Sequence, residues 1–191
     1  MNIRGKKVIL RAIEKEDLVR LHRWANDPKI QSIMGNIHFP SSRMFHEKWL
    51  ESLQNDNLNQ RFAIEPTDED HGIIGLSSLM SIDWRNNRAW HGVMLGDVDI
   101  RGKGYGKDAV MATMRYAFDE MHLERLDGQM IEYNTGSIRF YCDKLGWKRE
   151  GVARNWYYTG GRYWDKVMVG ITRQDYADLL ERTNYWEDEI S

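Results

Sequence analysis

A glycine-rich turn with several cations stands in the middle of the chain, in the stretch VDIRGKGYGKDA at residues 98–109. Glycine lets backbone N–H groups approach a ligand closely, and the start of a helix carries a partial positive charge. From Lys107 to Met121 apolar side chains recur at helical spacing, which predicts a helix directly after the turn. Arg101 and Lys103 add full positive charges beside Lys107. The pattern predicts an anion site, and a solvent-exposed helix start is the alternative.

Two nucleotide-binding motifs fit this turn poorly. A P-loop needs a glycine at position 101 and Ser or Thr at position 108, where the chain has Arg101 and Asp108. The segment Gly104–Ala109 satisfies the loose dinucleotide pattern GxGxxA. However, Asp97, Asp99 and the arginine separate it from the apolar strand that should precede it directly. A nicotinamide-dependent dehydrogenase is therefore the weaker interpretation.

A second motif, NTGSIRFYCDKLGW at residues 134–147, follows the next predicted strand. Together with R-x-x-G-x-G at 101–106, it resembles the coenzyme A-binding signature of the GNAT superfamily of N-acetyltransferases. The opening of the chain and its closing stretch DKVMVGITRQDY (165–176) are similar to the subgroup that contains ribosomal-protein N-terminal and spermidine acetyltransferases. The resemblance covers roughly residues 7–176.

The resemblance implies where acetyl-CoA binds. Backbone N–H groups across the turn hold the pyrophosphate, Asn134 hydrogen-bonds the pantetheine arm, and Ser137 leaves room for it. A backbone N–H near a strand bulge around residues 95–98 meets the oxyanion. For Asn134 a plain helix N-cap is a compatible alternative. The residues expected at the coenzyme are Leu95, Val98, Arg101, Gly102, Lys103, Gly104, Tyr105, Gly106, Lys107, Asn134 and Ser137.

The same resemblance assigns proton donation to Tyr141, close to the thioester sulfur. A thiol has a pKa of about 8.5 and a phenol one of about 10, so proton transfer to the leaving thiolate is feasible near neutral pH. The alternative is a core aromatic, because Phe140 and Tyr141 lie together on an amphipathic helix. The offset from Gly146 favours Tyr141 for the acid role.

The base that deprotonates the amine is open between three candidates. His91 lies on a predicted strand in which residues 89, 91, 93 and 95 share one face, and its unperturbed pKa of about 6.5 suits a base. Glu132, at the end of the following strand, is the rival, and a chain of water molecules is the third candidate. Cys142 as an acyl-carrying nucleophile is the weakest idea, because no histidine is near it in sequence.

Composition narrows the class of protein. The net charge is −2 and the pI about 6.3, without the basic bias of nucleic-acid-binding domains. A single cysteine excludes an internal disulfide and indicates a reducing, cytoplasmic location. No signal peptide or membrane-spanning segment is expected. The six histidines are scattered without metal-binding spacing, so no metal is expected.

The acceptor is not identified by the sequence. Eight tryptophans and nine tyrosines are a heavy load, and several gather around Trp84, Trp90 and residues 156–164. Such aromatics stack on a sugar or a cationic amine, or they pack in the core or in a homodimer surface. The acidic run at 68–70 attracts a cation or is a solvated loop. Candidate acceptors are a protein N-terminus, a polyamine, an amino sugar and an antibiotic amine.

The elements that position these residues run strand, two helices, strands, helix, strand, helix and a strand hairpin. This order predicts one α+β (mixed α/β) domain over residues 1–191, with its core at about 7–176 and a short C-terminal tail. The resemblance adds that the sheet is splayed, mostly antiparallel and flanked by helices.

The predicted function is that of an acetyl-CoA-dependent N-acetyltransferase. It moves an acetyl group to a primary amine by direct attack in a ternary complex. The expected partner is a small-molecule or peptide amine, with no nucleic acid and no membrane. A non-catalytic coenzyme A-binding sensor is the alternative, because the base is uncertain.

Overall fold

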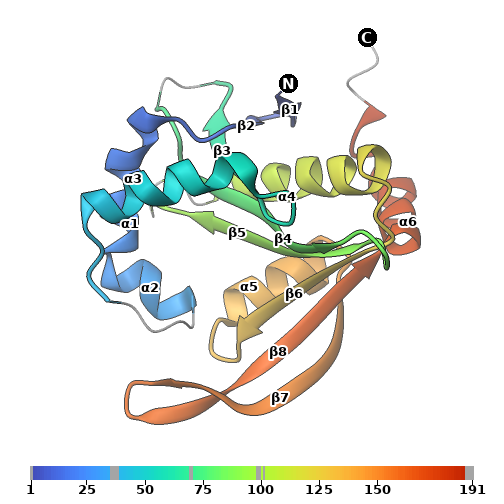
Figure 1. Cartoon of the computed structure of the whole chain (residues 1–191). Helices are drawn as coiled ribbons and strands as arrows, with labels where there is room; N and C mark the ends of the chain where they lie inside the picture. The colour runs from blue at the N-terminus through green and yellow to red at the C-terminus, as the bar shows by residue number, and fades with distance from the viewer. Residues whose placement is uncertain (1, 35–38, 69–70, 98–99, 101, 188–191) are drawn as a thin grey trace.

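The computed structural model describes residues 2–34, 39–68, 71–97, 100 and 102–187 (Figure 1). Its strands are β1 (Ile3–Arg4), β2 (Val8–Arg11), β3 (Gln60–Pro66), β4 (Gly75–Asp83), β5 (Arg88–Leu95), β6 (Arg125–Ile131), β7 (Lys148–Thr159) and β8 (Arg162–Thr172). Its α-helices are α1 (Leu18–Ala25), α2 (Pro28–Met34), α3 (Arg43–Ser52), α4 (Tyr105–Arg115), α5 (Thr135–Arg139) and α6 (Arg173–Thr183). Short 3-10 turns cover Lys15–Asp17 and Leu53–Asn55, and π-helical turns at Tyr116–Glu120 and Phe140–Lys144 extend α4 and α5.

All eight strands belong to one sheet, in the order β1-β2-β3-β4-β5-β6-β8-β7. Every neighbouring pair is antiparallel except β5 and β6, which are parallel. Helix α4 connects these two strands, as a parallel pair requires a crossover. The α+β class and the mostly antiparallel sheet are therefore confirmed.

The sheet splits between its two parallel strands. Arg88–Trp90 of β5 pair with Arg125–Asp127 of β6, and no pair follows. Beyond that point β5 stays with β4 as far as Leu95, whereas β6 stays with β8 as far as Ile131. Figure 1 shows the two halves of the sheet leaving a common region and separating. The expected splay is confirmed, and the gap exposes one edge of each half.

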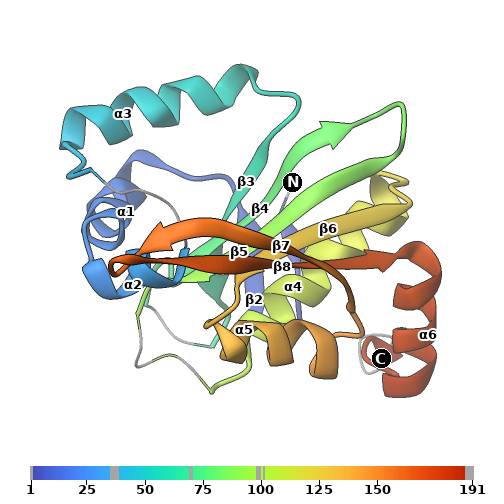
Figure 2. The same ribbon diagram turned by 90° about the horizontal axis from the view of Figure 1, so that it is seen from below.

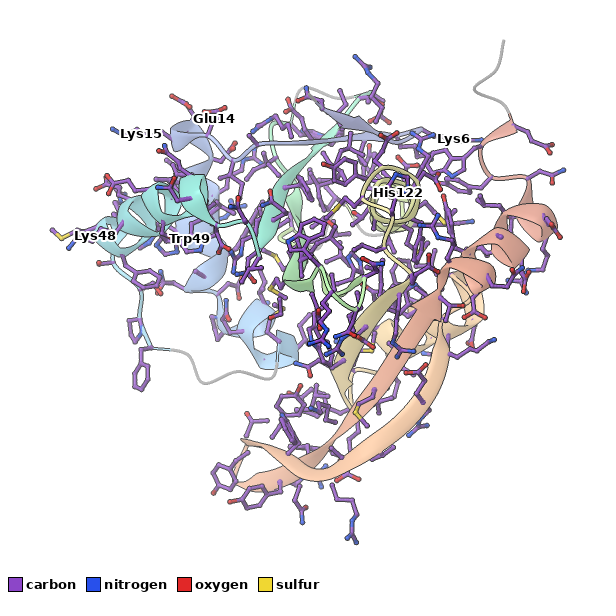
Figure 3. All side chains as sticks on the ribbon, turned by 45° about the vertical axis from the view of Figure 1, so that its right-hand side comes forward. Lys6, Glu14, Lys15, Lys48, Trp49 and His122 are labelled. Carbon is purple, nitrogen blue, oxygen red and sulfur yellow. The ribbon has the colours of Figure 1, made fainter. Side chains whose placement is uncertain are left out.

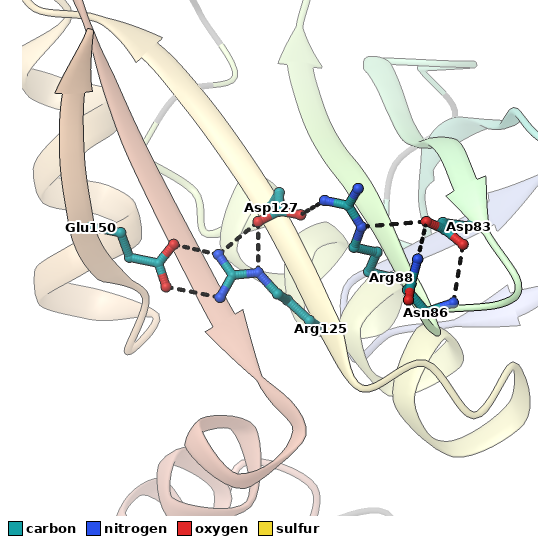
Figure 4. A network of polar contacts seen from close by, with 6 residues as sticks. All are labelled: Asp83, Asn86, Arg88, Arg125, Asp127 and Glu150. Atoms are coloured by element: carbon teal, nitrogen blue, oxygen red, sulfur yellow. Dashed lines mark hydrogen bonds and ion pairs between the residues drawn. The ribbon is translucent and has the colours of Figure 1, made fainter.

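A chain of charged side chains joins the strands where the split begins (Figure 4). Nε of Arg125 donates to Asp127 at 2.7 Å, and Nη1 of Arg125 donates to Glu150 of β7 at 2.9 Å. Arg88 lies 3.6 Å from Asp127 and 3.6 Å from Asp83 of β4. The Oδ2 atom of Asp127 is buried and accepts no hydrogen bond, so the Arg88 charge is its main compensation. The network links β4, β5, β6 and β7 at the closed end of the gap.

Helices cover both faces of the sheet. Helix α4 packs on β2–β5 through a core that includes Val8, Ile64 and Ala109. The opposite face of the same strands packs against α1–α3, where Trp24 and Ala63 are buried. Helix α5 and its π turn lie on the α4 side and join α4 in one core with β6 and β8 (Figure 2). The sheet therefore separates the α4–α5 side from the α1–α3 side.

The predicted helix after the glycine turn is confirmed. Its N-cap, Gly104, has a φ of 93°, a left-handed conformation that glycine adopts without strain. Val110, Met114 and Phe118 of the predicted apolar stripe behind it are fully buried. Ser42 caps α3 by accepting a hydrogen bond from the Phe45 N–H.

The chain after residue 176, predicted as a short tail, packs against the rest of the molecule. Helix α6 is followed by Tyr185 and Trp186, and the indole N–H of Trp186 donates to the Tyr176 hydroxyl at 2.9 Å. The guanidinium of Arg115 lies 3.8 Å from the Trp186 ring centroid. The packed part of the molecule therefore continues past residue 176, to at least residue 186. None of the helices in the described part of the chain combines the length and the apolar character needed to cross a membrane.

Candidate functional site

A cavity of about 370 Å³ occupies the gap between β5 and β6. Residues of β3–β6, helices α2 and α3, the start of α5 and Tyr157 of β7 line it. The Tyr133 hydroxyl donates to the Ser32 carbonyl and so ties α2 to the end of β6. The cavity therefore passes through the sheet, from the α2–α3 side to the α5 side.

One face of α5 supplies three of the predicted residues. Asn134, Ser137 and Tyr141 are three and four positions apart, which places them on one helical face, and all three line the cavity. The Asn134 side-chain oxygen accepts from the Ser137 N–H at 3.2 Å, so the N-cap alternative is confirmed. Because the cap uses only the oxygen, the amide Nδ2 keeps its two donors for a ligand.

Tyr141 lies at the buried inner end of that face. Its ring centroid is 5.0 Å from that of Trp147 and 5.3 Å from that of Phe140. Burial raises the pKa of its phenol well above the ordinary value of 10, so the hydroxyl stays protonated at neutral pH. The helix widens into a π turn here, a local distortion often found at functional sites. The geometry thus places a neutral, protonated hydroxyl beside the gap.

His91 also lines the cavity, but its environment does not suit a base. Its Nδ1 lies 3.2 Å from the Ser78 carbonyl, which only accepts, so Nδ1 carries the proton of the neutral ring. Nε2 is then an acceptor, and it is buried without a hydrogen-bond partner in the described structure. Burial lowers the pKa of His91 to about 4. Such a ring is a weak proton acceptor near pH 7, which is a correction to the predicted base.

Glu132 lies outside the cavity. Its side chain is exposed, and Oε1 accepts from the Asp165 N–H at 3.0 Å. The Glu132 N–H donates in turn to the Asp165 carbonyl, so this carboxylate serves the junction with the β7–β8 hairpin. The structure therefore does not bring it to the site, and the prediction of Glu132 as base is corrected.

The expected bulge at the end of β5 is absent from its described part. Trp90–Leu95 pair with Gly75–Met80 without a break, and the Gly96 N–H donates to the Ile74 carbonyl at 2.9 Å. The register shift lies at the other end of β4, between Met80 and Asp83. Because hydrogen-bonded pairs alternate along an antiparallel ladder, the even-numbered residues of β5 bond to β4. Val93 and Leu95 therefore direct their backbone N–H groups into the gap.

The glycine turn forms a cradle at the start of α4. Gly102 has a φ of 84°. The first backbone N–H groups of α4 have no partner within the helix, as at any helix start, and no side chain caps them. A Cβ on Gly106 would lie 3.2 Å from a Leu95 methyl group, so glycine keeps helix and strand close. Lys103 and Lys107 are present, whereas the predicted Val98 and Arg101 lie outside the described residues. This arrangement fits the pyrophosphate of coenzyme A.

The side chain of Tyr105, one of the residues predicted at the coenzyme, serves the fold. The ring is buried, and its hydroxyl donates to Asp68 at 2.9 Å. Only its backbone is in a position to serve the anion. Asp68 is thus committed to a structural hydrogen bond, and the other two acidic residues of the run at 68–70 lie outside the described residues.

Sequence reasoning missed the anchor of the cradle. Asp108 is fully buried, and its carboxylate accepts from the backbone N–H groups of residues 6–8 at 2.6–2.9 Å. The Tyr185 hydroxyl donates to the same carboxylate at 2.7 Å. Lys7, held in this way, donates from Nζ to the Lys103 carbonyl at 3.0 Å. The only sequence signal was an acidic residue in the first turn of a helix, which is usually explained by the helix dipole.

Other chemistry finds little support at this site. Burial and the nearby Asp143 raise the pKa of the Cys142 thiol, which disfavours the thiolate that a nucleophile needs. The described residues contain no cluster of three or more His, Cys, Asp or Glu side chains that would hold a metal ion.

Comparison with known proteins identifies the family of this chain. The model of the acetyltransferase (GNAT) domain matches residues 7–148. An uncharacterized N-acetyltransferase of Bacillus subtilis, the SPbeta prophage-derived YokL, is 29% identical over 172 residues, which are 90% of this chain and 93% of that protein. The uncharacterized N-acetyltransferase p20 of Bacillus licheniformis is 28% identical over 174 residues, 90% of this chain and 96% of the relative.

A solved structure has the same fold. Spermidine N-acetyltransferase from Vibrio cholerae, crystallised with CoA and spermine, superposes with a TM-score of 0.81 at 24% identity. The match covers 89% of this chain and 98% of that one. The GNAT domain model spans the glycine turn, so the dehydrogenase interpretation of this turn is wrong. A split sheet with a glycine cradle at its α4 edge and a matching domain model over most of the sequence establish that this chain belongs to the GNAT family of acetyltransferases and is an acyltransferase.

Proposed function

We propose that this enzyme transfers an acetyl group from acetyl-CoA to a primary amine, by direct attack within a ternary complex. The observation that carries the proposal is the cavity through the split sheet, which has the α5 residues on one side and an open mouth near α2 and α3 on the other. The amine and acetyl-CoA would enter from opposite faces of the sheet and meet at the edge of β5. A structural neighbour crystallised with CoA and spermine supports a coenzyme A donor and an amine acceptor.

The residues would divide the binding work as follows. The N–H groups at the start of α4, with Lys103 and Lys107, would hold the pyrophosphate. Nδ2 of Asn134 would donate to the pantetheine arm, and the small Ser137 would leave room for it. The backbone N–H groups of Val93 and Leu95 would donate hydrogen bonds to ligand atoms that lie along β5. They would also stabilise negative charge on the acetyl oxygen.

Transfer then needs two proton movements. The amine nitrogen forms a bond to the acetyl carbon, the carbon–sulfur bond breaks, and the products are an amide and free coenzyme A. The Tyr141 hydroxyl would give its proton to the departing sulfur and recover one from solvent. The amine proton would leave through water, because the pKa of about 4 makes His91 a poor acceptor.

The test is acetyl-CoA-dependent release of free thiol in the presence of a panel of primary amines. Release that depends on an acceptor supports the proposal. Calorimetry of acetyl-CoA binding without acceptor is the companion measurement. Tight binding without release for any amine would favour a non-catalytic sensor, and no binding at tens of micromolar coenzyme would contradict both.

A further inference from the structure

The acceptor mouth of the cavity has an unusual charge. Among the described residues that line the cavity, Arg61 of β3 is the only one with a charged side chain at neutral pH. The other walls near it are apolar and include Ile33, Met34 and Trp49. Among the described lining residues, a polycation would therefore find one positive charge and no carboxylate.

Arg61 belongs to the acceptor side of the sheet. Its neighbour Ala63, two residues on, packs with α1–α3, whereas Phe62 and Ile64 face α4. Arg61 pairs with Ser78 of β4, and Ser78 pairs with Gly92 of β5. Neighbouring strands are about 4.8 Å apart, so the backbone of Arg61 lies ~10 Å from the backbone of β5. A small molecule whose amine lies at the gap can span this distance. Because the glycine cradle lies at α4 on the opposite face, the pyrophosphate does not explain this arginine.

The guanidinium is held in place but not neutralised. Its carbon lies 5.9 Å from the Trp49 ring centroid, and it has no hydrogen bond or ion pair with another described residue. Figure 3 labels Trp49 on α3, the helix that covers this end of the cavity. The acid that feels the Arg61 charge is Asp56, whose pKa lies below its ordinary value mainly through a hydrogen bond from Asn59 and in smaller part through Arg61. A half-buried guanidinium keeps five donors that match an oxyanion in pairs.

We propose that the acceptor is a small primary amine that also carries an oxyanion, a carboxylate or a phosphate, and that Arg61 binds this group. The inference depends on the proposed function and specifies its substrate class. The apolar walls at Trp49 and Met34 cover the carbon skeleton, and the amine points along Ser78 and Gly92 toward the gap. Gly92 keeps this path open, since a Cβ there would lie 3.2 Å from the Ser78 Oγ. Polyamines are poor acceptors for this enzyme.

The experiment compares acceptor pairs that differ only in the anion. Thiol release is measured with L-phenylalanine and its carboxamide, with glucosamine 6-phosphate and glucosamine, and with spermidine. Wild-type enzyme is compared with Arg61→Met and with the control Arg85→Met, an exposed arginine in the β4–β5 turn. The ratio of kcat/KM between the members of a pair is compared across variants, which cancels the difference in amine pKa. The pair with the larger ratio tells whether the anion is a carboxylate or a phosphate.

In at least one pair, Arg61→Met should reduce the preference for the anionic acceptor by about ten- to a hundredfold, and Arg85→Met should leave it unchanged. Spermidine should be slower than the preferred anionic acceptor. Equal ratios in wild type and Arg61→Met, or spermidine as the best acceptor, would overturn the inference and leave the proposed function intact. No release with any acceptor, neutral amines included, would overturn both.

Discussion

Burial sets the protonation state of the two titratable side chains that face each other in the cavity. The ring centroids of His91 and Tyr141 are 5.9 Å apart, and neither ring carries a charge at neutral pH. Desolvation disfavours the charged form of each, so the phenol keeps its proton and the imidazole stays without a second one. The Tyr141 hydroxyl, a hydrogen-bond donor, and the His91 ring, whose Nε2 is an acceptor, thus lie side by side. Neither side chain brings a charge to this part of the cavity.

The first prediction concerns the proton donor. Tyr141→Phe should lower kcat about a hundredfold, because the departing thiolate loses its acid. It should leave the dissociation constant of coenzyme A within about twofold, since the ring and its packing remain. Steady-state thiol release and calorimetry measure the two quantities. Tyr158→Phe, on the exposed hairpin, is the matched control. A Tyr141→Phe enzyme with normal kcat would remove the residue from the acid role.

The second prediction is a pH dependence of stability from His91. The folded pKa is about 4 against an ordinary 6.5, so between these values the unfolded chain binds a proton that the folded chain does not. The free energy of unfolding therefore falls as the pH drops from 6.5 toward 4. At pH 4.5, His91 alone should make the free energy of unfolding about 2.5 kcal/mol lower than at pH 7.0.

Urea unfolding at pH 7.0 and 4.5 measures that loss, with His91→Gln as the test and the exposed His71→Gln as the control. The drop in unfolding free energy between the two pH values should be smaller by about 2.5 kcal/mol in His91→Gln than in wild type. Carboxylates that titrate in the same range contribute equally to all three proteins and cancel. Parallel curves for His91→Gln and wild type would show that the ring is not buried neutral.

Single residues were predictable from sequence where local spacing decides their position. Asn134, Ser137 and Tyr141 share a face because of helical periodicity alone, and the cavity contains all three. Two other outcomes depend on distant contacts. Glu132 turns away because the β7–β8 hairpin offers the Asp165 N–H, and Asp108 gains partners about 100 residues away. Spacing along the chain carries no information about either.

Among the elements, the parallel strands β5 and β6 depend on the charged network at their common end. The side chain of Asp127 is 12% exposed and relies on Arg125 and Arg88 for compensation. Separating the strands beyond this point exposes their edges, so the closed end must hold the two halves together. The network is therefore expected to stabilise the splay itself.

The third prediction tests the charged network at the common end of β5 and β6. Arg125→Met should lower the free energy of unfolding by about 2 kcal/mol, because it leaves a buried carboxylate poorly compensated; the cost is less than for a fully buried pair, since Arg125 is 31% exposed. Adding Asp127→Asn to that variant should recover part of the loss, since the unpaired charge is gone. Urea denaturation measures both proteins, with Arg85→Met as the control. Equal stability of wild type and Arg125→Met would mean that the common end of the two strands depends on backbone pairing alone.

Element types were predictable where a period was strong, and their irregularities were not. The helix α4 with its apolar stripe and the final strand hairpin both follow from local patterns. The short elements β1 and α2 were not predicted from the sequence, and the bulge was expected at the end of β5. The register shift instead occurs near Ser81, which has a φ of 48°. Bulge position depends on the pairing of two strands, which neither strand encodes alone.

At the scale of the whole molecule, the split sheet would let the two ligands of the proposed reaction meet without competing for one entrance. The halves of the sheet diverge, so a cavity passes between the faces covered by α1–α3 and by α4–α5. The single parallel pair creates this opening, and α4, the crossover between its strands, carries the cradle at its start. The resemblance of the two motifs predicted that the sheet is splayed. It did not predict that the C-terminal residues support the cradle.

The last prediction concerns that support. Truncation after Thr183 removes Tyr185, which bonds Asp108 behind the cradle, and Trp186, which packs on Arg115. The loss of one hydrogen bond to a buried carboxylate and of a half-buried indole should cost about 3 kcal/mol, or roughly 6–12 °C in melting temperature for a chain of this size. Because the tail touches the cradle and not the acceptor mouth, the KM for acetyl-CoA should rise while the order of acceptor preference stays unchanged. Truncation after Glu187 keeps both aromatic residues and should match wild type in melting scans and kinetics. A chain cut after Thr183 with unchanged coenzyme KM would show that Asp108 and the first strands hold the cradle without help from the C-terminus.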